Sequence, residues 1–251
     1  MIRRTFQILP KVGPGTERTL WREGVLDWDA FRDAPTVPGM RAGRKSEADR
    51  LLDEADALLE SNRLRELSSL LPRQEHWRLY PAARHGMACL DIETNGLSHD
   101  STVTVVGVHG PQGTYTLVKD DGLCMESLQE SLQGATLLVT FNGSCFDVPV
   151  LRHSFPGLDL NIPHLDLRFA CRRIGYSGGL KKIETSLGLK RDESLTDVDG
   201  MEAVRLWHRW RRMGDRSALQ TLMDYNRADT VNLAELADLV YPRLEHRCTE
   251  C

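Results

Sequence analysis

Hydrophobic and polar positions follow two different periods along the chain. Before Gly86 the pattern is helical: in Glu47–Leu70 apolar residues recur every three or four positions, which predicts one amphipathic helix that ends before Pro72. After Gly86, short apolar runs bounded by turn residues predict strands. We therefore expect a small, mainly helical N-terminal segment over residues 1–86 and a second domain over residues 87–251.

Five apolar segments after Gly86 have the length and composition of strands, and longer amphipathic segments follow them. The first three strands are expected to form an antiparallel meander, and the later two alternate with helices. This order predicts an α/β fold, a mixed five-stranded sheet flanked by helices. The expected strands are Met87–Glu93, Thr102–His109, Thr114–Val118, Thr136–Phe141 and Ile162–Leu165. The expected helices are Met125–Leu132, Asp147–His153, Leu167–Ile174, Leu180–Leu187, Val198–Arg212 and Ser217–Leu239.

The composition is that of a globular protein, with 41% hydrophobic and 27% charged residues among 251. No apolar run approaches the roughly 20 residues of a membrane span, and the charged start lacks the apolar stretch of a signal peptide. We therefore expect a cytoplasmic protein that does not associate with membranes. The net charge of −4 neither supports nor excludes a nucleic-acid substrate, because an acidic enzyme can still bind phosphates locally. Protein partners and oligomeric state stay open.

Acidic residues lie in three separate places that this fold would bring together. Asp91 and Glu93 are two positions apart near the end of the first strand, so their side chains share one face. Asp147 follows the fourth strand, and the carboxyl ends of parallel strands meet where such sheets bind ligands. Tyr225 and Asp229 share one face of the last helix by their i, i+4 spacing. Hard carboxylate oxygens that converge from separate elements suit divalent cations in phosphodiester hydrolysis, which predicts a nuclease site.

Each of these acids also has a purely structural explanation. Asp91 and Glu93 suit a solvated strand end before a turn, and Asp147 suits a helix N-cap. Asp229 suits a salt bridge with a basic residue such as Arg227. The order and context of the three places together favour the nuclease site over three unrelated structural roles.

Three segments resemble a known family of nucleases. Leu90–Leu97, Phe141–Asp147 and Tyr225–Asp229 resemble the three exonuclease motifs of the DEDD superfamily, tyrosine subtype. The closer resemblance is to the YprB-type branch of ribonuclease-H-like exonucleases. It is carried by the Phe-Asn-Gly-x-x-Phe-Asp run at Phe141–Asp147 and the His-Leu-Asp-Leu run at His164–Leu167. The resemblance extends over about residues 77–241.

The resemblance implies a ribonuclease-H-like fold that holds two divalent cations, Mg²⁺ or Mn²⁺. It implies a metal-dependent 3′→5′ exonuclease that acts on single-stranded DNA or RNA, with Tyr225 orienting the attacking water. The implied catalytic residues are Asp91, Glu93, Asp147, Tyr225 and Asp229. The implied metal ligands are Asp91, Glu93, Asp147 and Asp229.

Three residues are candidates for contact with the substrate. Asn142 and Gly143 would let the backbone approach a ligand closely, and Lys181 opens a helix beside two glycines, where it can reach a phosphate.

Two alternative functions stay open: a structure-selective endonuclease on the same fold, and a non-catalytic nucleic-acid-binding subunit whose carboxylates serve folding or docking. Closed-circular substrate separates the exonuclease from the endonuclease, and tight binding without turnover would indicate the third function.

The N-terminal segment adds a hypothesis of its own. Leu9–Glu17, with Gly13 and Gly15 before a helix, resembles the hairpin and second helix of a helix-hairpin-helix DNA-backbone binder. Only eight residues precede Leu9, which leaves little room for the first helix. Thr16 as the N-cap of the helix explains the same pattern without any ligand.

The C-terminal residues His246, Cys248 and Cys251 have the His-x-Cys-x-x-Cys spacing of half a zinc site. No second pair of Cys or His at metal-ligand spacing accompanies them in the sequence, so a frayed terminus is the favoured explanation over zinc binding.

Overall fold

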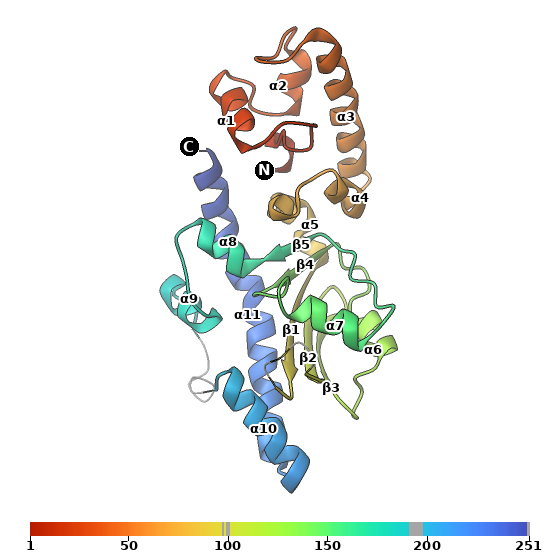
Figure 1. The fold of residues 1–251 in the computed structure, drawn as a ribbon, viewed down its shortest axis with the longest axis vertical. Helices are drawn as coiled ribbons and strands as arrows, with labels where there is room; N and C mark the ends of the chain where they lie inside the picture. The colour runs from red at the N-terminus through yellow and green to blue at the C-terminus, as the bar shows by residue number, and fades with distance from the viewer. Residues whose placement is uncertain (97, 99–100, 191–197, 250–251) are drawn as a thin grey trace. The chain divides into compact units, whose positions relative to one another are not determined.

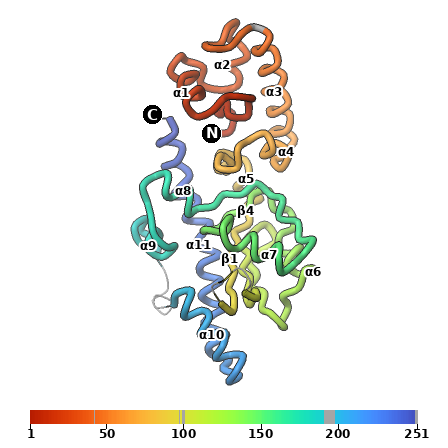
Figure 2. Tube along the Cα trace, viewed as in Figure 1, coloured from red at the N-terminus to blue at the C-terminus, as the bar shows by residue number. Residues whose placement is uncertain are grey.

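The structure, a computed structural model, describes residues 1–96, 98, 101–190 and 198–249. It divides into two compact units: unit 1 contains Met1–Arg84 together with the C-terminal residues from Glu245, and unit 2 contains His85–Leu244 (Figures 1 and 2). Leu97 of the first motif and Cys251 of the C-terminal run lie outside the described residues. The division into domains at residue 86 stays a prediction about independent folding.

Unit 1 is mainly helical, as predicted. The expected single helix over Glu47–Leu70 is wrong, because Asn62 has the left-handed φ of 55° and interrupts it. Thr16 is not an N-cap either, since the first helix has Gly13 at that position. The helices are α1 (Pro14–Arg22), α2 (Trp28–Asp33), α3 (Ala42–Glu60), α4 (Leu64–Ser69) and α5 (Tyr80–Ala83), with 3₁₀ segments η1 (Ile2–Arg4), η2 (Arg73–Leu79) and η3 (Arg84–Gly86).

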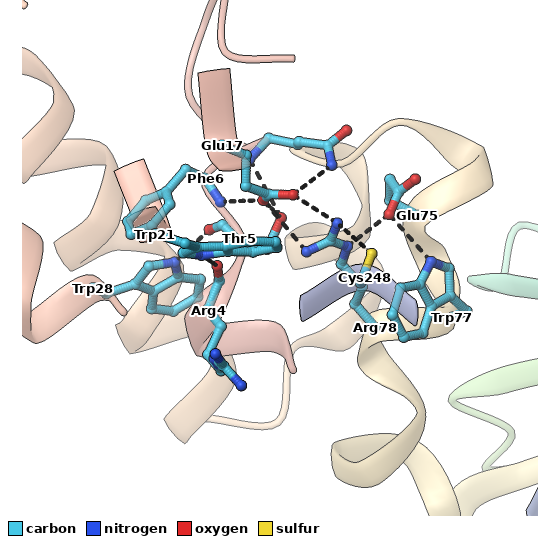
Figure 3. A network of polar contacts seen from close by, with 11 residues as sticks. Arg4, Thr5, Phe6, Glu17, Trp21, Trp28, Glu75, Trp77, Arg78 and Cys248 are labelled. Carbon is cyan, nitrogen blue, oxygen red and sulfur yellow. Dashed lines mark hydrogen bonds and ion pairs between the residues drawn. The ribbon is translucent and has the colours of Figure 1, made fainter. Parts of the chain in front are cut away.

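A buried charged network lies inside unit 1 (Figure 3). Arg78, whose side chain is 0% exposed, donates to Glu17 at 2.8 Å and to Glu75 at 2.6 Å. Glu17 also accepts a hydrogen bond from the Thr5 hydroxyl at 2.8 Å, and Arg78 contacts the Cys248 Sγ at 3.7 Å. Because the charges are paired and hydrogen-bonded, removing one partner would leave another buried and unpaired, at a high cost in stability.

Unit 2 contains the sheet that the sequence predicts. Among the described residues, five strands follow the order β3-β2-β1-β4-β5. The β1–β2 and β2–β3 pairs are antiparallel, while β1–β4 and β4–β5 are parallel, so the sheet is mixed as expected. The strands are β1 (Met87–Thr94), β2 (Val103–Gly110), β3 (Gly113–Val118), β4 (Leu137–Thr140) and β5 (His164–Asp166).

Helices cover both faces of this sheet (Figure 1). The last helix is longer than expected, because it continues past Leu239 and contains Pro242, whose missing N–H leaves one backbone hydrogen bond of the helix unmade. The helices are α6 (Met125–Ser131), α7 (Asp147–Ser154), α8 (Leu167–Arg173), α9 (Leu180–Leu187), α10 (Gly200–Met213) and α11 (Arg216–Thr249). Within the described ranges, no helix is long and apolar enough to cross a membrane.

The alternation of side chains in the sheet decides which residues meet which helices. Leu90 and Val106 belong to a core that includes Leu151 of α7. The neighbouring Val105 belongs to the opposite core, which includes Leu222 of α11. Since successive side chains of a strand point to opposite faces, the acids at odd positions of β1 point towards α11.

Candidate active site

Strand β1 carries the first two acids of the site. Asp91 and Glu93 lie on the face of β1 that α11 covers, and they pair across the ladder with Gly107 and Val105 of β2. Glu93 is buried and Asp91 is half-buried. The register changes after Glu93, where a bulge ends the regular pairing. The two carboxylates therefore sit at the end of a buried strand with little water around them.

Asp147 reaches the same place from the loop that follows β4. Asn142, with the left-handed φ of 69°, turns the chain away from the strand. Asp166 at the end of β5 holds this loop, accepting hydrogen bonds from the backbone N–H of Asn142 at 2.8 Å and of Ser144 at 3.0 Å. Asp147 then opens α7 as a buried residue, and Phe146 occupies the N-cap position, so helix capping does not explain the acid.

Helix α11 supplies the remaining predicted residues. Tyr225 and Asp229 are both buried on it, one turn apart. The Tyr225 side chain is hydrogen-bonded to Asp229 and lies within electrostatic reach of Glu93 and Asp91. The structure thus gathers all five predicted catalytic residues from β1, α7 and α11 into one cluster.

Burial and mutual repulsion make this cluster costly to ionise. Burial, followed by repulsion from Glu93, Asp229 and Asp147, raises the pKa of Asp91 well above its usual value. Burial, then Asp229 and Asp147, does the same to the pKa of Glu93. Burial raises the pKa of Asp147 to about 7. The pKa of Tyr225 also rises, first through burial and then through Asp229, so its hydroxyl keeps its proton. Perturbed acids that converge from separate elements are typical of functional sites.

The donor set fits divalent cations by its chemistry. The four carboxylates offer hard oxygen ligands; Glu93, Asp147 and Asp229 are buried, and Asp91 is half-buried. Burial raises the pKa values of Asp91, Glu93 and Asp147, so a bound cation would favour their ionised forms. In the part of the chain that the structure describes, no group of three or more His, Cys, Asp or Glu side chains is already arranged to hold an ion.

The three substrate-contact candidates lie beside the cluster in different ways. The Asn142 side chain accepts a hydrogen bond from Arg168 at 2.7 Å, at the edge of the loop that leads to Asp147. Gly143 has a packing reason for lacking a side chain, because an added Cβ would lie 2.5 Å from the Thr140 Cβ. The Lys181 ammonium lies 5.3 Å from the centre of the Tyr225 ring and donates to the Val198 carbonyl. Their contact with substrate stays a prediction.

The sequence interpretation missed two residues that shape this cluster. Asn226 is fully buried on α11 between Tyr225 and Asp229, and its amide donates to Asp91. Gly107 lies opposite Asp91 in the ladder and leaves space for that amide. Helical spacing could have indicated Asn226, a polar residue on the stripe that buries Leu222, whereas the role of Gly107 depends on strand register.

Comparison with known proteins places unit 2 in a family. Residues 88–241 match the family described as the RNase H superfamily. The chain is similar to the crystal structure of Escherichia coli RNase D, described as an exoribonuclease involved in structured RNA processing, at 17% identity and a TM-score of 0.46. That alignment covers 70% of this chain and 46% of the RNase D chain, so this chain spans less than half of it. It is also similar to the EXO domain of Aedes aegypti Nibbler, at 14% identity and a TM-score of 0.43, over 68% of this chain and 85% of that domain. No curated protein sequence matches this chain.

Proposed function

The chain belongs to the RNase H superfamily, and from this premise we propose that it is a metal-dependent 3′→5′ exonuclease of the DEDD type, tyrosine subtype and YprB-type branch. Its substrate would be single-stranded DNA or RNA. The observation that carries the proposal is the buried cluster of Asp91, Glu93, Asp147 and Asp229, whose carboxylates repel one another on the strand face covered by α11. A structural role alone gives no reason to bury four acids together, because unpaired buried charge is destabilising.

In this proposal the four acids hold two divalent cations, Mg²⁺ or Mn²⁺. When bound, such cations lower the pKa of a water molecule and offset the charge that develops on the phosphate. The acids contribute by converging from β1, α7 and α11, so that oxygen ligands from separate elements are held close together by the fold. Their low exposure excludes bulk water and strengthens each electrostatic interaction in the site.

Tyr225 orients the attacking water in this proposal. Its hydroxyl remains protonated because burial and the neighbouring acids raise its pKa, so it acts as a fixed hydrogen-bonding group and not as a base. Lys181, with its ammonium above the Tyr225 ring, is placed to meet a substrate phosphate on the same side of the cluster. Asn142 and Gly143, in the loop before Asp147, would let the backbone approach the substrate closely.

The test follows 5′-labelled single-stranded DNA and RNA oligonucleotides on a denaturing gel with Mn²⁺, Mg²⁺ or EDTA. Wild type is compared with Asp91→Ala and Asp229→Asn, and Asp224→Asn is the matched control, since Asp224 is exposed on the same helix. The expected result is a ladder that shortens from the 3′ end, requires metal, and is lost in both site variants but not in the control.

Other outcomes of this experiment would contradict the proposal. Discrete internal cuts, or cleavage of closed-circular substrate, would indicate an endonuclease on the same fold. Tight binding of the oligonucleotides without turnover in either metal would indicate a nucleic-acid-binding subunit. Cleavage that survives Asp91→Ala would place the chemistry somewhere other than the described cluster.

A further inference from the structure

Asn226 is a buried amide in direct contact with the carboxylate cluster. It is 0% exposed on α11. Its Nδ2 lies 2.9 Å from the Asp91 Oδ2 and 3.3 Å from the Asp91 backbone oxygen. The amide also makes a side-chain hydrogen bond with Glu93. A single neutral donor on the last helix therefore contacts both acids of the first strand.

The direction of the amide follows from its surroundings. The N–H₂ group faces Asp91, and this orientation suits the ionised acids that would bind a cation, because ionised carboxylates accept hydrogen bonds and offer no proton to a carbonyl oxygen. The opposite atom, Asn226 Oδ1, is buried without a hydrogen-bond partner among the described residues. A buried carbonyl oxygen without a hydrogen-bond partner lowers the stability of the folded protein. The contact between the Asn226 amide and Asp91 is therefore made at a cost in stability.

Gly107 makes this contact sterically possible. It pairs with Asp91 across the β1–β2 ladder and lies under α11. An added Cβ at Gly107 would lie 2.5 Å from Asn226 Oδ1 and would collide with the Thr230 hydroxyl. That hydroxyl donates to the Asn226 backbone oxygen at 2.7 Å, which fixes the turn of α11 from which the amide extends. The absence of a side chain at Gly107 is therefore what allows α11 to approach β1 this closely.

From these contacts we infer that Asn226 is a positioning residue that fixes the orientation of the Asp91 carboxylate for cation binding. Gly107 makes room for the Asn226 side chain, because it has no side chain of its own. The inference rests on the proposed function of the cluster. The amide contacts Oδ2 and the backbone oxygen of the same residue, so it restricts rotation of the Asp91 side chain. Oδ1 of Asp91 takes no part in this contact and would be the oxygen that ligates a cation.

The test measures Mn²⁺ binding by isothermal titration calorimetry on metal-free protein, without any substrate. The variants are Asn226→Ala and Asn226→Asp, which has the shape of asparagine but lacks its donors. The matched control is Asn232→Ala, because Asn232 lies on the same helix and donates to a carboxylate, Glu184, at 3.2 Å outside the cluster. We expect Asn226→Ala to weaken Mn²⁺ binding roughly 10- to 100-fold, as is usual when a group that orients a metal ligand is removed, and Asn232→Ala to leave it unchanged.

Two further measurements separate positioning from a general loss of structure. Gly107→Ala should also weaken Mn²⁺ binding, as Asn226→Ala does, because the added methyl group displaces the Asn226 amide without altering any acid. In the nuclease assay, Asn226→Ala should raise the Mn²⁺ concentration needed for half-maximal rate, and Asn226→Asp should lower the rate even at saturating Mn²⁺, since a carboxylate there repels Asp91. Circular dichroism and thermal melting identify any variant that fails to fold, and the folded variants then decide the question.

Asp91→Ala shows whether the inference or the proposed function has failed. If wild type binds Mn²⁺, Asp91→Ala abolishes binding, and folded Asn226→Ala and Asn226→Asp both bind and cleave as wild type does, the positioning role is refuted and the nuclease site stands. If Asp91→Ala binds Mn²⁺ as wild type does, the cation site itself is refuted, and the role of Asn226 with it.

Discussion

The cluster predicts an unusual pH dependence of stability in the metal-free protein. The pKa of Asp147 is raised in the folded state, from 3.8 to about 7, chiefly by burial. The folded protein therefore keeps a proton on Asp147 at pH values where the unfolded chain has lost it. This contribution to stability is fully present below about pH 4 and is lost as the pH rises through about 7. The pKa values of Asp91 and Glu93 are raised in the same direction, so they add to the effect.

The size of the effect follows from the shift in pKa. One pKa unit corresponds to about 1.4 kcal/mol, so the shift of Asp147 from 3.8 to about 7 is worth about 4 kcal/mol in total. Of this, about 3 kcal/mol is lost between pH 5 and pH 8, because the unfolded carboxyl is already ionised at pH 5. A loss of this size is a large fraction of the stability of an ordinary domain.

Urea denaturation in EDTA at pH 5, 6, 7 and 8 measures this loss, with Asp147→Asn as the comparison. The asparagine cannot ionise, so the free energy of unfolding of the variant should fall less between pH 5 and pH 8, and the difference from wild type isolates Asp147. Millimolar Mn²⁺ should restore stability mainly at pH 8, where the acids are ionised, by about 2.7 kcal/mol when its concentration is a hundred times the dissociation constant. Parallel curves for wild type and Asp147→Asn would refute the argument that Asp147 is held protonated by its surroundings.

Three further predictions concern the catalytic hydroxyl, the buried ion pair and the N-terminal glycines. Tyr225→Phe should lower kcat of oligonucleotide cleavage roughly 10- to 100-fold while the melting temperature changes little, because only the group that orients water is lost; an unchanged kcat would remove the assigned role. Arg78→Met should cost about 3–5 kcal/mol in urea denaturation by leaving buried acids unpaired, against less than about 1 kcal/mol for the exposed Arg63→Met, and equal losses would contradict the importance of burial. Gly13→Glu and Gly15→Glu should fold normally, since an added Cβ meets nothing within 4 Å at either position, and should weaken nucleic-acid binding in fluorescence anisotropy while sparing cleavage of a short oligonucleotide. Unchanged affinity in both would eliminate the helix-hairpin-helix hypothesis.

Local patterns in the sequence were enough to predict the sheet and the direction of its acids. Successive side chains of β1 point to opposite faces of the sheet. Asp91 and Glu93, two positions apart, could therefore be placed on one face from the sequence alone. The i, i+4 spacing of Tyr225 and Asp229 predicted that they lie side by side, because residues four positions apart are neighbours on one face of a helix. The errors concerned where helices break and end: Asn62 adopts a left-handed conformation that divides one expected helix into two, and the last helix continues through Pro242.

The contact between Asn226 and Asp91 could not be predicted in this way, because it joins residues 135 positions apart and depends on two registers at once. The pairing of Asp91 with Gly107 requires the register of β1 against β2, and the approach of Asn226 requires the rotation of α11 over that pair. A one-residue slip of β2 would place Val106 or Val108 opposite Asp91, and a branched side chain would then occupy the space of the amide. The acids of this cluster are therefore recognisable from sequence, whereas the residues that hold them in place become apparent only when strand register and helix packing are known.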